Sequence, residues 1–215
     1  MPHVLIGSLP YLLQGAAVTL LLSIVVVGLG TLLGAALGIL AVIGGRVIRS
    51  LITTYIFVLR GVPVLVVMFL GYYIFPAIGY RVSAYVAVAA AQIVYVGAFV
   101  AEIVRSAVLS VPPTQVAAAK GLGMRTHTML AQVILPQAAR ISIPPLLNNS
   151  LTAIKQTSYA SVVGVWELTY AAREVVERTL ASFQIFLGVM AIYFVICYPL
   201  SLLARWSESK LTIPR

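Results

Sequence analysis

The sequence predicts an all-α membrane protein with five transmembrane helices, and three observations carry that prediction. Of its 215 residues, 61% are apolar and only 9% are charged, whereas roughly a quarter of the residues in a soluble domain are charged. Uncharged segments recur along the chain, and a helix needs about 20 such residues to cross the hydrocarbon core. Fourteen basic and five acidic residues separate these segments. We therefore expect residues 1–215 to form a single transmembrane domain.

The net charge of +9 indicates membrane topology and not nucleic-acid binding. Nucleic-acid binding requires basic residues gathered on one face, whereas these residues punctuate apolar segments, as the topology signals of membrane proteins do. Only His3 precedes the first apolar segment, without a basic region or a small-residue cleavage site, so we expect Met1 onward to be mature protein. The single cysteine, Cys197, excludes an intrachain disulfide.

The first span is predicted at about 14–43, in an uncharged stretch that ends before Arg46. Within it, Gly30, Gly34 and Gly38 recur every four residues and therefore share one helix face. Such a face lets a neighbouring backbone approach closely. Glycine is also common in membrane helices generally, so the spacing alone leaves both interpretations open.

The second and third spans are predicted at about 58–79 and 83–110. Pro63 stands near the start of the second span, where it kinks or starts a helical segment. The third span continues past the charged Glu102 and Arg105, because Pro112-Pro113 is the first strong helix stop.

The fourth span, about 138–160, is polar and contains Pro144 and Pro145. Such a segment is tolerated at membrane depth only where protein or a water-filled cavity covers it, and short, interrupted segments mark the translocation path of transporters. A charged, amphipathic connection over 166–178 leads to an apolar fifth span at about 180–204.

Between the third and fourth spans lies a basic, alanine-rich segment, 112–136, that belongs in water. It is too short to cross a bilayer and has too little apolar surface to fold alone, so it is suited to lie against a partner protein. We expect a short helix, a glycine break and a second helix, formed by Ala117–Lys120, by Gly121 with Gly123, and by Met124–Leu135, which Pro136 ends.

Several ordered motifs carry a family resemblance. In the 112–136 segment, Ala118-Ala119 is followed after three residues by Gly123 and after nine more by Val133-x-Leu135-Pro136. This pattern resembles the cytoplasmic loop of ABC-importer permeases that docks on the ATPase subunit, although Ala117 replaces the acidic residue of that motif. The neighbouring motifs are similar to polar amino acid permeases of the histidine/glutamine type: Arg60-Gly-Val-Pro63, Gly97 to Arg105, Leu135-Pro-Gln-Ala138, Lys155-Gln-Thr-Ser158 and Val163-Gly-Val-Trp-Glu167-Leu.

The resemblance implies the type I importer permease fold, the bacterial cytoplasmic membrane and the translocation of polar amino acids or related derivatives. It implies three protein partners besides the lipid bilayer: a dimeric ABC ATPase, a second permease that is identical or paralogous, and an extracytoplasmic solute-binding protein. The chain has no GxxxxGK[ST] phosphate loop. We therefore expect a non-catalytic subunit without a cofactor or metal of its own, with ATP and Mg on the ATPase.

The resemblance also assigns roles within the 112–136 loop, which would transmit closure of the ATPase dimer to the third and fourth spans. Small residues would let the loop helix sit deep in a groove of the ATPase, and Leu135-Pro136 would define where the fourth span begins. The expected coupling residues are Ala117, Ala118, Ala119, Lys120, Gly123, Met124, Leu135 and Pro136.

The fourth span supplies the candidate substrate path, formed by Asn148, Asn149, Lys155, Gln156, Thr157 and Ser158. Asn149 and Gln156 are seven residues apart and share a helix face, where they offer hydrogen bonds to a polar solute or to a neighbouring helix. Similar permeases often carry carboxylates at these two positions, so the amides argue against a lysine- or arginine-like substrate. Lys155 either meets a substrate carboxylate or extends to the membrane surface. With a paralogous partner, either half can carry the site.

Glu102 and Arg105 are three residues apart near one end of the third span and can form an ion pair. Ionisable residues at membrane depth are functional candidates. We interpret this pair as a gate or a structural contact and not as a substrate ligand.

The basic residues predict the orientation through the positive-inside rule. They join the first two spans, join the third and fourth, and follow the fifth: Arg46 and Arg49; Lys120, Arg125 and Arg140; Arg205, Lys210 and Arg215. On the opposite side lie Arg81 and a connection in which Glu167, Glu174 and Glu177 outnumber Arg173 and Arg178. The N-terminus is therefore predicted outside, and the 112–136 loop and the C-terminus in the cytoplasm.

Two other classes remain as alternatives. An ion-gradient-driven secondary transporter or channel subunit needs intramembrane carboxylates for coupling, and only Glu102 qualifies. A structural membrane protein without a transport role does not need a polar, proline-bearing span.

Overall fold

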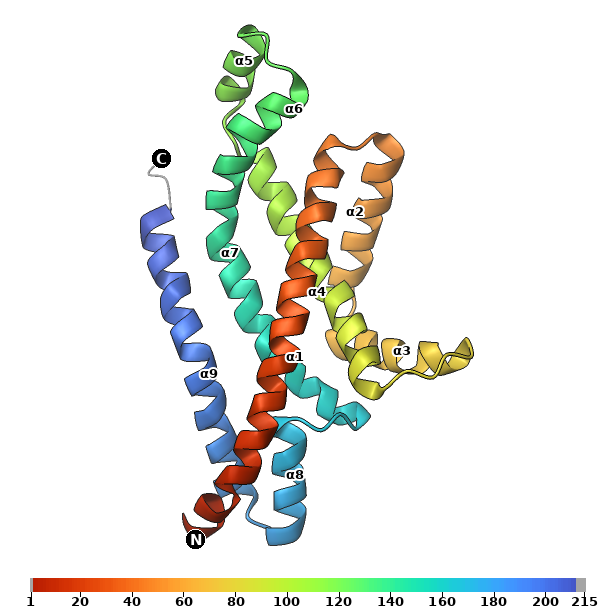
Figure 1. Cartoon of the computed structure of the whole chain (residues 1–215), viewed down its shortest axis with the longest axis vertical. Helices are drawn as coiled ribbons and strands as arrows, with labels where there is room; N and C mark the ends of the chain where they lie inside the picture. The colour runs from red at the N-terminus through yellow and green to blue at the C-terminus, as the bar shows by residue number, and fades with distance from the viewer. Residues whose placement is uncertain (1, 212–215) are drawn as a thin grey trace.

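The computed structural model describes residues 2–211, and these fold into an elongated bundle of helices (Figure 1). Met1 and residues 212–215, with Arg215 of the predicted cytoplasmic tail, lie outside the described residues. In chain order the elements are α1 (Pro2–Ile43), α2 (Arg46–Gly61), α3 (Val64–Ala77), α4 (Ala84–Leu109), α5 (Pro113–Gly121), α6 (Thr126–Met129), the π-helical turn η1 (Leu130–Ile134), α7 (Leu135–Gln156), the 3-10 helix η2 (Thr157–Val163), α8 (Leu168–Thr179) and α9 (Ser182–Leu211).

Three helices in the described part of the chain are long and apolar enough to cross a membrane: α1, α4 and α9. α2 and α3 pass that test only as a pair, and they meet at an angle of 109°. The predicted span at 58–79 is therefore not one straight helix. The physical reason is Pro63, which lacks a backbone N–H and forces the preceding Val62 into an extended conformation, with φ −108° and ψ 137°.

α1 begins at Pro2, well before the predicted start of the first span at residue 14. Its 42 residues extend about 63 Å, roughly twice the thickness of the hydrocarbon core. Tertiary contacts explain the extra turns, because Leu12 and Ala16 are buried in an apolar cluster with Leu168 and Ala171 of α8. α4, by contrast, matches the predicted 83–110 to within one residue at each end.

The fourth predicted span differs from expectation at both ends. Pro136 does not end a helix, because η1 passes directly into α7 and Pro136 lies in the first turn of that helix. It lacks the backbone N–H that would bond to the preceding turn, and that turn is the π-helical η1. α7 also continues through Pro144 and Pro145 without a break. The change in geometry comes at Thr157, where η2 begins. The prolines remove two backbone donors, which helices packed in a bundle tolerate.

The most extensive helix packing joins α1 to α4 along the predicted glycine face. A Cβ at Gly34 would lie 2.5 Å from the Cβ of Val100 and 2.6 Å from the carbonyl oxygen of Gly97. Gly30 and Gly38 likewise leave no room for a side chain against α4. The close-approach interpretation of this spacing is therefore confirmed.

A buried carboxyl group joins the other end of α1 to α8 and α9. Glu167 is fully buried, and its Oε1 accepts a hydrogen bond from the backbone N–H of Tyr170, 3.0 Å away, which caps α8. Its Oε2 accepts hydrogen bonds from the hydroxyls of Thr19 on α1, at 3.1 Å, and Tyr193 on α9, at 3.3 Å. Burial raises the pKa of Glu167, and the hydrogen bonds oppose that shift only in part.

The glycine face predicts a sharp difference between two alanine substitutions in α1. Gly34→Ala forces α1 and α4 apart and should lower the free energy of unfolding by about 1–3 kcal/mol. Gly28 is the matched control, since a Cβ there meets no atom within 4 Å, and Gly28→Ala should leave stability unchanged or raise it slightly. Thermal unfolding in detergent measures both. Equal midpoints for the two variants would contradict the packing argument.

The environment of Glu167 predicts a pH-dependent stability. A folded-state pKa above the unfolded value of about 4.3 means that stability is greatest below that pH and falls as pH rises through the folded-state pKa. Glu167→Gln removes this ionisation. The difference in unfolding midpoint, variant minus wild type, should therefore increase between pH 4 and pH 8. Glu177→Gln, on the exposed face of α8, is the control. Wild-type and Glu167→Gln curves that stay parallel would refute the prediction.

Candidate translocation path and coupling loop

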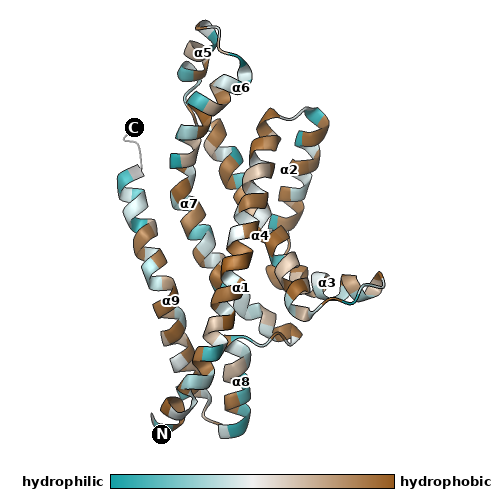
Figure 2. Cartoon of the chain, in the orientation of Figure 1, coloured by the Kyte–Doolittle hydropathy of each residue, from teal (hydrophilic) through white to brown (hydrophobic). Residues whose placement is uncertain are grey.

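The loop between α4 and α7 projects from one end of the bundle (Figure 1), and Figure 2 shows hydrophilic residues on its helices α5 and α6. The predicted glycine break occurs at Gly123, whose φ of +72° is the left-handed conformation that glycine favours. Its backbone N–H donates to the carbonyl oxygen of Lys120, 2.9 Å away. The segment therefore turns back after α5 and enters α6, as the composition predicted.

The loop residues divide between an exposed and a buried side. Ala117, Ala118 and Lys120 are exposed, and the apolar Leu122 at the turn is 82% exposed. Ala119, another of the expected coupling residues, is 4% exposed and belongs to the core of this chain. A short helix lying on its own chain must bury one side.

The remaining coupling candidates hold the loop to the bundle or flank it. Gly123 and Pro136 are exposed, whereas Met124 and Leu135 are half-buried and pack against the core that contains Ala119. A cavity of about 460 Å³ lies beside α5, lined in part by Val42, Ala117 and Lys120.

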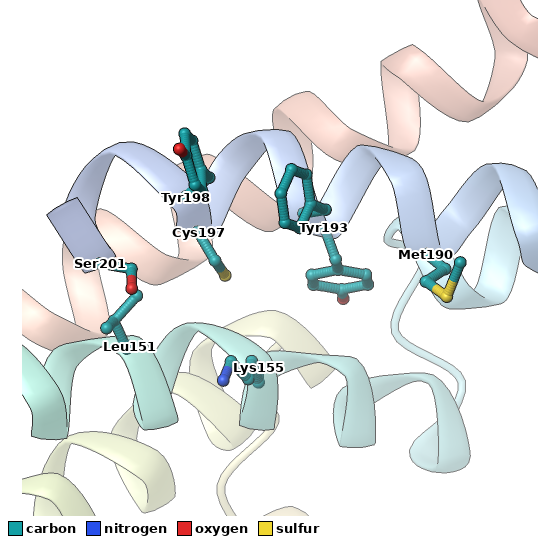
Figure 3. Close-up of a pocket in the computed structure, with 8 residues that line it drawn as sticks. Leu151, Lys155, Met190, Tyr193, Cys197, Tyr198 and Ser201 are labelled. Carbon is teal, nitrogen blue, oxygen red and sulfur yellow. The ribbon is translucent and has the colours of Figure 1, made fainter.

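Two of the candidate path residues lie on the α9 side of α7. The side-chain amide of Asn148 donates to Oε1 of Glu208 on α9, 3.0 Å away. Lys155, two turns further along, lines a cavity of about 350 Å³ between α7 and α9 together with Tyr193, Cys197 and Ser201 (Figure 3). These two candidates therefore do not share a surface with Asn149 and Gln156.

Asn149 and Gln156 lie on another face of α7. Both are half-buried, and neither side chain is hydrogen-bonded to another residue within 2–211. α7 is helical throughout this stretch, so their spacing of seven places them on one face, as predicted. Their amides are free to bind a polar group outside this chain.

The last two candidates belong to η2. Thr157 is fully buried, and its hydroxyl donates to the carbonyl oxygen of Ile154 at 2.7 Å. Ser158 is half-buried and donates to the carbonyl oxygen of Lys155 at 2.8 Å. Both hydroxyls therefore donate to backbone carbonyl oxygens where α7 passes into the 3-10 helix η2.

The possible ion pair in α4 is formed. Nε and a terminal nitrogen of Arg105 donate to the two carboxylate oxygens of Glu102 at 2.9 and 2.7 Å. Arg60 also approaches this pair, a contact that its position in the sequence does not predict. Its guanidinium, at the end of α2, lies 4.0 Å from Glu102 and 5.6 Å from the ring centroid of Phe99. Only the motif around Arg60 hinted at a role, because local spacing does not reveal which helices meet.

A second contact that the sequence does not predict fixes α7 against α4. Gln92 is fully buried, and its side-chain amide donates to the carbonyl oxygen of Ala153, 3.1 Å away. The Nε2 of Gln92 thus links α4 to α7, whereas its Oε1 has no hydrogen-bond partner among the described residues. Among residues 2–211, no group of three or more His, Cys, Asp or Glu side chains is placed to hold a metal ion.

Solved structures of transporters share this arrangement of helices. An amino acid ABC transporter, crystallised with histidines, superposes with a TM-score of 0.89 at 31% identity, over 95% of this chain and 96% of that one. The inward-facing methionine ABC transporter MetNI superposes with a TM-score of 0.79 over 95% and 98% of the two chains. At 15% identity, the latter shows the fold alone.

Curated relatives agree with this arrangement. The L-cystine transport system permease protein TcyB of Bacillus subtilis is 39% identical over 77% of this chain and 71% of its own length. The glutamine transport system permease protein GlnP of Escherichia coli is 31% identical over 96% and 95% of the two chains. The model of the family described as binding-protein-dependent transport system inner membrane component matches residues 30–213. The chain belongs to this family and is a non-catalytic permease subunit of an ABC importer.

Proposed function

We propose that this chain forms the membrane path of an ATP-driven importer for polar amino acids or closely related derivatives. The observation that carries the proposal is the near full-length match, at 31% identity, to an amino acid ABC transporter. Relatives named for cystine and glutamine point to the same substrate class. Asn149 and Gln156 favour a substrate without a cationic side chain, because amides supply no counter-charge.

The proposed topology has five crossings, with the N-terminus outside and the C-terminus in the cytoplasm. The crossings are α1, the bent pair α2 and α3, α4, α7, and α9. Arg46 and Arg49 lie at the turn between α1 and α2, and Lys120 and Arg125 lie in the loop at the same end of the bundle. By the positive-inside rule, this end faces the cytoplasm.

The proposed partners follow from this orientation. An ABC ATPase dimer, carrying ATP and Mg, receives α5; a second permease, identical or paralogous, completes the path; and a solute-binding protein delivers substrate from outside. The exposed Ala117 and Ala118 permit close contact with a groove on the ATPase, and Leu122 offers it an apolar side chain. This assembly places the chain in a bacterial cytoplasmic membrane, in keeping with its family.

The buried side of the loop suits the transmission of motion. Ala119 packs in the same core as Met129 and Ile134, which lead without a break into α7. Displacement of α5 by the closing ATPase therefore moves the start of α7. Because α7 also carries Asn149 and Gln156, the same helix connects the ATPase contact with the path.

A bulky side chain on the exposed face of α5 should uncouple the two activities. We expect Ala118→Trp to reduce uptake by about 5- to 150-fold, the usual range of coupling between sites, while the ATPase continues to hydrolyse ATP. Ala118 is exposed, so the change should not disturb folding. Uptake into proteoliposomes, measured together with phosphate release, gives the ratio of the two rates.

Ser209→Trp, at an exposed position near the end of α9, is the control and should keep the wild-type ratio. An unchanged ratio in Ala118→Trp would contradict both the docking role of α5 and its location on the ATPase side of the membrane.

The two faces of α7 predict different outcomes for two neighbouring asparagines. Asn149→Ala and Gln156→Ala should each change the KM for uptake by about 2- to 10-fold, the effect of losing one hydrogen bond to the solute. Asn148→Ala is the matched control, because its amide bonds to Glu208 and not to the path. Its KM should stay at the wild-type value. Equal KM values in all three variants would assign Asn149 and Gln156 to contacts between helices.

A further inference from the structure

A second polar cavity lies between the end of α2, α4 and α7. Its volume is about 440 Å³, within the range of about 300–1,000 Å³ typical of small-molecule sites. The residues that give it polar character are Arg60, Glu102, Ser106 and Ser110, and Ile141 and Pro145 of α7 form the opposite wall. None of these residues belongs to the predicted substrate path.

The charges at this cavity do not balance. Arg105 donates hydrogen bonds to both carboxylate oxygens of Glu102, at 2.9 and 2.7 Å. The nearest guanidinium nitrogen of Arg60 lies 4.0 Å from the same carboxylate. Two guanidinium groups thus share one carboxylate. Arg60 donates no hydrogen bond to another residue within 2–211, and its side chain is 47% exposed. The cavity therefore offers guanidinium N–H donors that have no hydrogen-bond partner among the described residues and are suited to a carboxylate.

The same cavity offers acceptors on its other walls. Pro145 has no N–H, so the carbonyl oxygen of Ile141 lacks the partner four residues ahead that a regular α-helix provides. The hydroxyls of Ser106 and Ser110 donate to Glu102 at 3.4 Å and to the carbonyl oxygen of Ala107 at 2.8 Å. Their oxygens keep lone pairs that can accept hydrogen bonds. An ammonium group would find acceptors here, close to the carboxylate of Glu102.

The cavity also lies on the proposed route. At 100° per residue, Pro145, Asn149 and Gln156 fall within about 40° of one another around α7. Pro145 is about 6 Å from Asn149 along the helix axis, toward the end that carries α5. A solute leaving the amides of Asn149 and Gln156 for that end of the bundle reaches this cavity next.

We propose that this cavity is a second amino acid site, on the cytoplasmic side of the path, that binds the head group common to all α-amino acids. Arg60 binds the α-carboxylate, while Glu102, the serine hydroxyls and the carbonyl oxygen of Ile141 receive the α-ammonium group. The proposal rests on the proposed function for the class of ligand. It adds that the site recognises the zwitterion and not the side chain.

Protection of an introduced thiol tests the site in the assembled transporter. In a Cys197→Ala background, Ile103→Cys places a thiol in the cavity wall without removing a group that binds the ligand. L-Glutamine should slow its alkylation by a maleimide several-fold and saturably. 4-Aminobutanamide, which is glutamine without its carboxylate, should not protect. Ser201→Cys, in the cavity between α7 and α9, is the control and should be alkylated at the same rate with or without glutamine.

Substitution of Arg60 connects the protection to this side chain. Arg60→Gln should raise the half-protecting glutamine concentration by about tenfold, and Arg60→Lys, which keeps the charge, should raise it less. Absent protection, equal protection by 4-aminobutanamide, or an unchanged concentration in Arg60→Gln would overturn the site. ATP-driven uptake by the wild-type complex separates the two proposals. Uptake without protection leaves the proposed function standing and refutes the site, whereas a complex that takes up no amino acid refutes both.

Discussion

The close contact between α1 and α4 is the constraint on which the rest of the structure depends. Lipid is as apolar as the side chains it surrounds, so helices in a membrane associate through close packing and polar contacts. Gly30, Gly34 and Gly38 bring the α1 backbone against α4 at distances that admit no Cβ. α2, α3 and α7 then pack on α4, and α8 packs on α1. Each of these helices takes its place from that first pair.

Buried polar groups complete the frame around α7. Glu167 joins α1, α8 and α9 at one end of the bundle, and Gln92 fixes α7 against α4. Unsatisfied polar groups are costly in lipid, so such contacts hold helices in defined positions. α7 lies between this frame and the projecting loop, with α9 on one side and the free amides of Asn149 and Gln156 on another. This arrangement gives one helix both a direct connection to the projecting loop and a polar surface.

Local signals anticipated the elements whose ends depend on nearby residues. α4 ends where Pro112-Pro113 predicted, and the loop turns at Gly123 because glycine adopts a positive φ without strain. Contacts between residues far apart in the chain decided other features. α1 starts early because α8 buries Leu12, and Ala119 turns inward because the loop lies on its own core. Pro144 and Pro145 were expected to interrupt the fourth span, but α7 continues through both. A helix packed in a bundle tolerates the lost backbone donors, whereas an isolated helix does not.

The sequence by itself determined that this is a helical membrane protein, where its polar loop lies, and which residues share a helix face, because composition and helical periodicity are local properties. Asn149 with Gln156 and Glu102 with Arg105 are of this kind. Only the tertiary structure decided that Asn148 and Lys155 face α9, that Arg60 meets Glu102, and that Glu167 is buried. These contacts depend on how each helix is rotated against its neighbours. That rotation is set by the packing of side chains far apart in the chain.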